Sequence, residues 1–541
     1  MSYKNSKYSI ILPLVIIASF LVGMFVNNHF YRQRATLGGN DNIQRSITAN
    51  KIGAIMNMIS TSYVDSVDVD SLEESAINYL IKELDPHTAY LTAKEMEKSN
   101  EELVGNFGGV GIQFYSFEDT IVVVNAVKGG PSEKAGIRAG DRVIKVGDSL
   151  VAGKEHKRSN DDIMKMMRGE IGTAVDLTIF RRSINDTIVA HVERGSIPLS
   201  SVTVAYMIND TLGFIKVDYF GMQTYNEFMN GISTLLNNGM KHLIVDMRGN
   251  NGGVMSSALR MVNEFLPADR LILYTQGNHV PRSDYKSNGK GMLKELPLTV
   301  LIDEGSASAA EIFAGALQDN DRAKIIGRRS FGKGLVQEQR VMQDGSALRL
   351  TIARYYIPSG RSIQKPYKLG EDGKMDYYMD LVNRYEHGEL YQADSVKFDE
   401  SQKFETYGGR TVYGGGGIMP DIFVPADTTQ YTNYLYDLVT KQLIYKYTFK
   451  FLDAHRAEIL DSVDNWQELQ EYLKQFDLVT DVVAYAAQNG LPVNKKELKE
   501  SKRLIRIMAE AHIARHLFDN VGFYPIYDEI DTTLQEAIKM L

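Results

Sequence analysis

The chain contains no cysteine in its 541 residues. It therefore forms no disulfide, holds no thiolate-bound metal, has no thiol nucleophile and carries no lipid on an N-terminal cysteine. Histidine is also scarce, with 10 residues and neither an HExxH motif nor a close pair, so we expect no metal site. The net charge is −8 and no long basic run is interleaved with aromatic residues, which argues against nucleic acid as a partner.

The length suggests three or four domains at about 150 residues each. Residues 9–26 form an apolar run that follows Lys4 and Lys7 and is just long enough to cross a bilayer. The positive flank would stay in the cytoplasm and the rest of the chain would lie outside it. No small-x-small cleavage site follows, so an uncleaved signal anchor is favoured over a cleaved signal peptide.

The hydrophobic pattern divides the remaining chain into four regions. Residues 31–100 predict a linker and amphipathic helices, with a capping-box signature at Ser71 and Glu74. Residues 101–196 predict a small β-rich domain, and residues 197–427 alternate between strand and helix, with a polar insertion at about 366–410. Residues 428–541 predict a helical domain.

Continuous apolar runs in the third region indicate strands that are buried on both faces. They lie at residues 213–217, 243–245 and 298–302, and a helical pattern at 225–236 separates the first two. Strand–helix alternation of this kind predicts an α/β core.

Ser308 is a candidate nucleophile, because it follows the strand at 298–302 and opens a helix at 309–317. Unpaired N–H groups and the helix dipole at that position favour negative charge on a substrate oxygen. Ser308 and Glu311 also match a capping box, so Ser308 could serve only as a helix cap. Ser306 is a rival nucleophile that spacing does not exclude.

Lys333 lies in a glycine-flanked turn twenty-five residues later, and a serine with a lysine base is a recognised nucleophile variant. Burial lowers a lysine pKa and would let Lys333 accept the serine proton, whereas a solvent-facing turn lysine could not. Gln337 lies on the same side of a strand but roughly 13 Å further along. Its contact with Lys333 would require a bend or the full reach of both side chains.

Two glycine-rich segments could supply backbone amides. Gly252 and Gly253 end the sequence D-M-R-G-N-N-G-G after a buried strand, where they could hold an oxyanion or form only a tight turn. The stretch P-S-E-K-A-G-I-R-A-G-D at residues 131–141 resembles a PDZ domain, a module that adds a peptide as a strand and holds its carboxylate. The candidate cradle for that carboxylate is Gly108, Gly109, Val110 and Gly111, although an ordinary glycine turn is the alternative.

Taken together, these motifs resemble the C-terminal processing peptidases, or tail-specific proteases, over roughly residues 71–424. They occur in the same order along the chain as in that family. The matching segments are D-P-H-T-A-Y-L, the PDZ-like region, D-M-R-G-N-N-G-G, G-S-A-S-A-A-E-I-F-A-G-A-L-Q-D, S-F-G-K-G-L-V-Q, Y-I-P-S-G-R-S-I-Q and G-G-I-M-P-D-I. One departure is Ala310, where many members carry serine. Any one segment alone would not be specific.

The resemblance implies a ClpP/crotonase-like α/β protease core with an inserted PDZ domain and flanking helices. Ser308 would be the nucleophile, Lys333 the general base and Gln337 the residue that orients it. The amides of Ala309 and of Gly252 or Gly253 would form the oxyanion hole. No metal or organic cofactor is implied.

The implied partners are protein or peptide substrates with free, apolar C-termini, which the PDZ domain would dock while it gates the active site. With the N-terminal apolar run, we expect a single-pass protein of a bacterial inner membrane whose bulk lies in the periplasm. The helical regions are candidates for self-association. Two alternatives remain: a non-catalytic PDZ scaffold that kept the fold, and a Ser-His-Asp hydrolase that uses His87.

Overall fold

The computed structural model describes residues 51–117, 120–153, 158–396 and 399–541, and the chain divides into two compact units, Met1–Ile81 and Lys82–Leu541. The first unit contributes two described helices, α3 (Lys51–Ser62) and most of α4 (Val69–Lys82). Helix α4 starts before Ser71, whose N–H donates to the Asp68 side chain at 3.2 Å. The predicted cap at Ser71 is therefore wrong, because Asp68 receives that N–H.

The membrane span predicted at residues 9–26 lies outside the described residues. Within the part of the chain that the structure describes, no helix is long and apolar enough to cross a membrane. The N-terminal anchor therefore stays a prediction.

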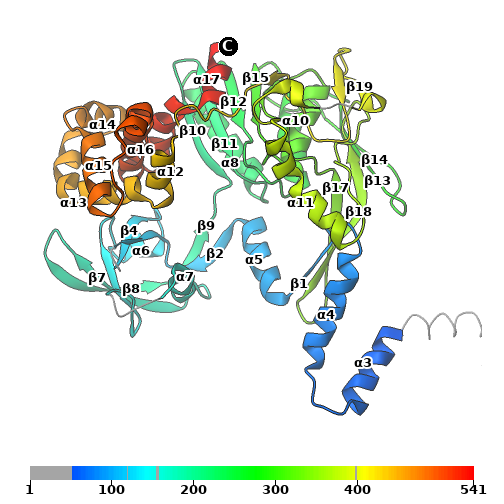
Figure 1. The fold of residues 1–541 in the computed structure, drawn as a ribbon, viewed down its shortest axis with the longest axis horizontal. Helices are drawn as coiled ribbons and strands as arrows, with labels where there is room; N and C mark the ends of the chain where they lie inside the picture. The colour runs from blue at the N-terminus through cyan, green and yellow to red at the C-terminus, as the bar shows by residue number, and fades with distance from the viewer. Residues whose placement is uncertain (1–50, 118–119, 154–157, 397–398) are drawn as a thin grey trace, which may run out of the picture. The chain divides into compact units, whose positions relative to one another are not determined.

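A six-stranded sheet forms the centre of the second unit (Figure 1), in the order β10-β11-β12-β15-β16-β21. Its strands are β10 (Val202–Met207), β11 (Leu212–Val217), β12 (His242–Asp246), β15 (Leu298–Ile302), β16 (Lys324–Gly327) and β21 (Ile422–Phe423). All neighbouring strands are parallel except β10 and β11. The predicted α/β core is confirmed.

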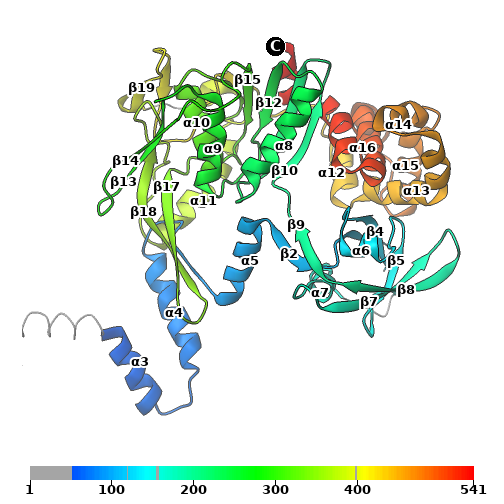
Figure 2. The ribbon, with the colours of Figure 1, turned by 180° about the vertical axis from the view of Figure 1, so that it is seen from behind.

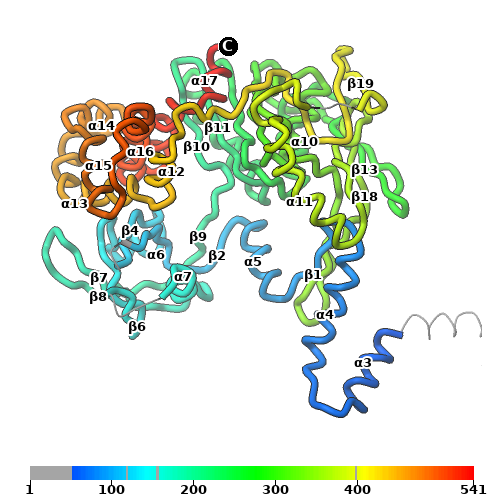
Figure 3. Tube along the Cα trace, in the orientation of Figure 1, coloured from blue at the N-terminus to red at the C-terminus, as the bar shows by residue number. Residues whose placement is uncertain are grey.

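Both faces of this sheet are covered by helices. Phe228, Met261 and Phe313 pack on one face from α8 (Thr224–Asn237), α9 (Met255–Phe265) and α10 (Ala309–Asp319), which Figure 2 shows from behind. The opposite face carries Phe214, Ile244 and Leu301, which pack against Leu534 and Ala537 of α17 (Thr532–Lys539). Helix α17 therefore belongs to the core around this sheet, and Figure 3 shows its place in the tube trace.

A second sheet brings the other candidate residues to the core. It pairs β1 (Ala89–Leu91), β18 (Ala347–Tyr356), β13 (Leu271–Gln276) and β14 (Ser283–Lys286), and β17 (Leu335–Val341) also pairs with β18. Lys333 lies just before β17, and His87 lies just before β1. The pairing register of β17 and β18 shifts between Val336 and Gln337, because Ile352 of β18 is an extra residue between their partners Ala353 and Thr351.

The β-rich domain that resembles a PDZ domain follows α5 (Ala93–Val104), whose Thr92 and Glu95 form a capping box. Its main sheet has the order β3-β4-β5-β7-β8 and leaves β3 at an edge, with β6 paired to β5. The elements of the domain are β2 (Asn106–Gly109), β3 (Ile112–Phe117), β4 (Thr120–Ala126), α6 (Pro131–Lys134), β5 (Arg142–Val146), β6 (Ser149–Leu150), α7 (Asn160–Met167), β7 (Ala174–Arg181), β8 (Asp186–Glu193) and β9 (Gly195–Pro198).

The insertion and the C-terminal region are mainly helical. The insertion contains α11 (Glu371–Glu386), two short 3-10 turns, Ala393–Ser395 and Glu400–Gln402, and the hairpin of β19 (Lys403–Glu405) and β20 (Thr411–Tyr413). The C-terminal helices with their own apolar core are α12 (Asn433–Thr440), α13 (Leu443–Ser462), α14 (Trp466–Leu473), α15 (Leu478–Gln488) and α16 (Lys495–Tyr527). A 3-10 turn, Asp528–Ile530, leads back to α17 and the sheet.

Candidate active site

Ser308 lies at the junction between β15 and α10 in a conformation that few residues other than glycine adopt. Its φ is 54° and its ψ is −111°. Strained backbone of this kind persists only where the surrounding structure holds it, and it is common at reactive residues. The strained turn directs the helix amides and the serine toward the same space.

Ser306 is less accessible than Ser308, which is only partly buried. Its side chain is fully buried, its hydroxyl donates to the Met247 carbonyl at 2.8 Å, and the Asp303 N–H donates to it at 3.0 Å. A hydroxyl engaged on both sides is suited to fixing the loop. The geometry therefore favours Ser308 over its rival as the nucleophile.

The buried carboxylate of Glu311 holds the Ser308 turn and the Lys333 turn together. Its Oε2 accepts the N–H groups of Ser308 and Lys333, both at 2.8 Å. Its Oε1 accepts the Gly332 N–H at 2.7 Å and the Ser330 hydroxyl at 2.6 Å. Burial raises the pKa of Glu311 to about 7, although these donors oppose the rise. Because all four partners donate, the ionised form satisfies them best.

Lys333 has the environment that a neutral amine needs. Burial lowers the pKa of Lys333, the nearby Arg349 lowers it further, and Glu311 and Asp85 oppose the shift. Its Nζ donates to Gln337 Oε1 at 3.1 Å. Lys333 and Gly334 precede β17, so the chain between Lys333 and Gln337 is not a continuous strand, and the two side chains meet.

The amide of Gln337 is fixed by the segment that precedes β1. Its Nε2 donates to the His87 carbonyl at 2.6 Å, which turns Oε1 toward Lys333. Asp85 stabilises that segment by accepting the N–H groups of His87 at 2.9 Å and Thr88 at 3.1 Å. The backbone of the D-P-H-T motif thus orients Gln337, which in turn contacts Lys333.

The imidazole of His87 faces another way. Its Nε2 lies 2.9 Å from the hydroxyl of Tyr377 on α11. Burial lowers the pKa of His87 to about 4, and the charge of Lys333 contributes to the shift. The structure therefore gives His87 a structural partner, and the insertion that carries Tyr377 packs against the lysine side of the site.

The two glycines after β12 differ in what their amides do. The Gly252 N–H donates to Asn250 Oδ1 at 2.8 Å, so it is already engaged. Within the described residues, the Gly253 and Ala309 N–H groups have no hydrogen-bond acceptor. A Cβ on Gly252 would lie 2.7 Å from Ser308 Cβ and 2.9 Å from Ala309 N, so only glycine allows this approach. Of the two predicted alternatives, Gly253 has the amide that is free for an oxyanion.

One cavity of about 1480 Å³ joins these groups and extends to other regions. Its lining includes Ser308, Lys333 and Gln337. It reaches the PDZ domain at Val127 and helix α16 at Tyr524. A peptide in this cavity would contact the serine, the lysine and the PDZ domain together.

The PDZ segment predicted as a carboxylate cradle is only partly a turn. Gly108 and Gly109 belong to β2 and pair with Ser196 and Gly195 of β9. Only Gly111, with a φ of 74°, has the left-handed conformation that favours glycine. The segment leads directly into β3, the edge strand to which a peptide could pair.

Tyr355 is a buried residue of the site that the sequence did not indicate. Its hydroxyl donates to the carbonyls of Ser308 at 3.0 Å and Lys333 at 2.5 Å. It therefore joins the same two turns as Glu311, but through their carbonyl groups. No local motif marks such a tyrosine, because its partners are distant in the sequence.

We expect Tyr355→Phe to lower both the unfolding temperature and the rate of peptide cleavage. The change leaves the buried Lys333 carbonyl without its donor, at a cost of about 1–3 kcal/mol. Thermal unfolding and a peptide assay would measure both effects. Tyr356→Phe is the matched control, because Tyr356 stacks on Tyr274 instead. Equal behaviour of the two variants would contradict the role of the Tyr355 hydroxyl.

Comparison with protein families assigns three parts of the chain. Residues 211–372 match peptidase family S41, and residues 108–192 match the PDZ domain. Residues 434–519 match a family of unknown function, DUF8443. The PDZ domain predicted from the sequence is thereby confirmed.

Several known proteins are similar to this chain. The "Probable CtpA-like serine protease" of Staphylococcus haemolyticus (strain JCSC1435) is 34% identical over 315 residues, which is 58% of this chain and 62% of that protein. The protein of the same name from Staphylococcus aureus (strain COL) is 33% identical over 316 residues, with the same shares. The match thus spans less than two thirds of these relatives.

Among solved structures, the photosystem II D1 C-terminal processing protease is 26% identical, with a TM-score of 0.32, and the match covers 58% of this chain and 89% of that one. The family assignment does not rest on this likeness. It rests on the S41 and PDZ matches and on the CtpA-like relatives. On that evidence, the chain carries a match to peptidase family S41 at residues 211–372 beside a PDZ domain at residues 108–192, and it is similar to CtpA-like serine proteases.

Proposed function

We propose that the protein is a serine endopeptidase that cleaves protein tails with Ser308 as nucleophile and Lys333 as general base. The observation that carries the proposal is the arrangement around Glu311. One buried carboxylate binds the backbone of both residues, and one cavity exposes both side chains. The lowered pKa of Lys333 supports its role as a base.

The reaction would pass through an acyl-enzyme. Neutral Lys333 accepts the Ser308 hydroxyl proton as Oγ attacks the peptide carbonyl, and the N–H groups of Ala309 and Gly253 stabilise the oxyanion. The protonated lysine then gives its proton to the leaving amine, and the C–N bond breaks. Water attacks the serine ester with Lys333 again as base, which releases the acid and restores the serine.

The PDZ domain would select substrates by their C-terminal tails. An extended tail can pair with the free edge of β3, while its carboxylate lies at residues 108–111. The cavity that joins the PDZ domain to Ser308 supports this path. We expect unfolded proteins with apolar C-termini as substrates.

The cellular setting is proposed from the sequence. The apolar run at residues 9–26 would anchor the chain in a bacterial inner membrane, with the catalytic part in the periplasm. Self-association through the helical regions stays a prediction.

We expect the chain to cleave an unfolded protein with a free apolar C-terminus, and both Ser308→Ala and Lys333→Met to abolish cleavage. General-base catalysis alone contributes about 10²–10⁴-fold. Fragments would be identified by mass spectrometry, and Ser306→Ala and His87→Ala are the comparison variants.

Loss of cleavage only in Ser308→Ala and Lys333→Met would establish the proposed pair. Loss in His87→Ala with intact folding, and retention in Lys333→Met, would favour the Ser-His-Asp alternative. Binding of the tail without cleavage under all conditions would favour the scaffold alternative.

A second expectation concerns tail recognition. A substrate amidated at its C-terminus should be cleaved more slowly than the same substrate with a free carboxylate, because the amide removes the charge that backbone N–H groups hold. The ratio of kcat/KM for the two forms measures this preference. Equal values would contradict docking of the carboxylate by the PDZ domain.

A further inference from the structure

We infer that Asp531, near the C-terminal end of the chain, is a positioning residue for the oxyanion loop at residues 249–253. It acts through Arg248, which directly precedes that loop. The inference rests on the proposed function, since it assigns a role to the loop in catalysis. Neither the family matches nor the sequence motifs include Asp531.

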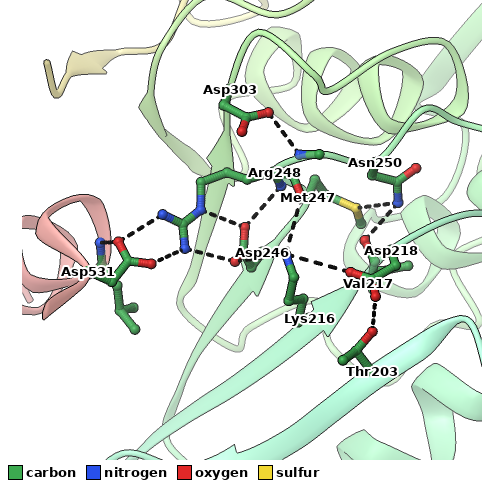
Figure 4. Close-up of polar contacts among 12 residues, drawn as sticks. Thr203, Lys216, Val217, Asp218, Asp246, Met247, Arg248, Asn250, Asp303 and Asp531 are labelled. Atoms are coloured by element: carbon green, nitrogen blue, oxygen red, sulfur yellow. Dashed lines mark hydrogen bonds and ion pairs between the residues drawn. The ribbon is translucent and has the colours of Figure 1, made fainter. Parts of the chain in front are cut away.

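Arg248 is held from two sides by carboxylates (Figure 4). Its Nε donates to Asp246 Oδ1, its Nη2 donates to Asp246 Oδ2, and both distances are 2.8 Å. On the other side, Nη1 donates to Asp531 Oδ1 at 2.8 Å and Nη2 donates to Asp531 Oδ2 at 2.5 Å. A planar guanidinium that is paired on two edges has one permitted orientation.

Asp246 alone could not supply this constraint. It lies at the end of β12 and is 1% exposed. Burial would raise its pKa, but Arg248 and Lys216 hold the pKa of Asp246 at about 2. Asp246 lies two residues before Arg248 in the chain and pairs with only one edge of the guanidinium. Asp531 contacts the same guanidinium from a separate element, 283 residues away.

The position of Asp531 is itself well defined. It caps α17, where its Oδ1 also accepts the Leu534 N–H at 2.9 Å. Helix α17 packs on the sheet through Leu534 and Ala537. Three residues before Asp531, the Asp528 carboxylate accepts the Tyr206 hydroxyl of β10 at 2.6 Å. These contacts anchor the carboxylate to the sheet, independently of the loop.

Hydrogen bonds hold the backbone that follows Arg248, and one of them joins it to Ala307, the residue before Ser308. Lys216 Nζ donates to the Arg248 carbonyl at 3.2 Å, and the Gly249 N–H donates to Asp303 Oδ1 at 2.8 Å. Two residues after Arg248, the Asn250 carbonyl accepts the Ala307 N–H at 2.8 Å. In this proposal, the orientation of Arg248 fixes the start of the loop that brings Gly252 and Gly253 to Ser308.

The test compares Asp531→Asn with Asp477→Asn in the full chain. Both aspartates are helix caps, because Asp477 caps α15 by accepting the Thr480 N–H. Asparagine keeps the capping function in each case. Only Asp531 contacts Arg248, so the pair separates loss of a cap from loss of the arginine partner.

We expect Asp531→Asn to lower kcat by about 10–100-fold with KM within about twofold, since removal of a whole oxyanion donor costs about 10²–10³-fold. Asp477→Asn should leave both constants unchanged. Hydrogen exchange of the peptide that contains residues 249–253 should become faster only in Asp531→Asn. If Asp531→Asn does not fold, Arg248→Lys provides the same test, because lysine cannot form the two-sided pair.

Equal kinetics and equal exchange of the two aspartate variants would overturn the inference, and so would a rise in KM with kcat unchanged. The exchange measurement needs no activity. If the parent fails to cleave but the loop exchanges faster in Asp531→Asn, the proposed function fails while the positioning contact stands.

Discussion

The site depends on the burial of one carboxylate between two turns. Glu311 accepts hydrogen bonds from the backbone of Ser308, Gly332 and Lys333, and from the Ser330 side chain. Without it, three buried N–H groups would lose their acceptor, and each such loss costs about 1–3 kcal/mol. The same contacts bring a helix start that favours negative charge next to the partly buried Lys333. Glu311, which takes part in the cap of α10, thus also connects the turn of the proposed nucleophile with the turn of the proposed base.

Other elements tighten this arrangement from separate directions. Tyr355 on β18 binds the carbonyls of the two turns. Arg384 of the insertion donates to the carbonyls of Ser330 at 3.0 Å and Arg329 at 2.6 Å, just before the lysine turn. The insertion therefore stabilises the base side of the site. On the side of the glycine loop, Asp531 pairs with Arg248, so that each proposed catalytic group lies next to contacts from outside its own motif.

The sequence predicts the parts of this site that are encoded locally. Ser308 and Lys333 lie in short motifs. The strands at 213–217 and 298–302 are continuous apolar runs because they are buried in the structure. The same local view assigns Glu311 only a capping role, because spacing reveals the helix start but not the donors from the lysine turn. It leaves the Gln337 contact open, because residue spacing does not show where β17 begins. Tyr355 and Asp531 act on partners 22 and 283 residues away, which no periodicity predicts.

The central claim is that Lys333 is the base that activates Ser308. The most direct test is the pH dependence of the acylation rate of Ser308, measured in a single turnover for the parent and for Lys333→Met. Because the base must be neutral, the rate should rise with pH through a pKa below the usual lysine value of 10.5, and Lys333→Met should abolish it. A rate that is already maximal just above the His87 pKa of about 4, and that survives Lys333→Met, would contradict the account.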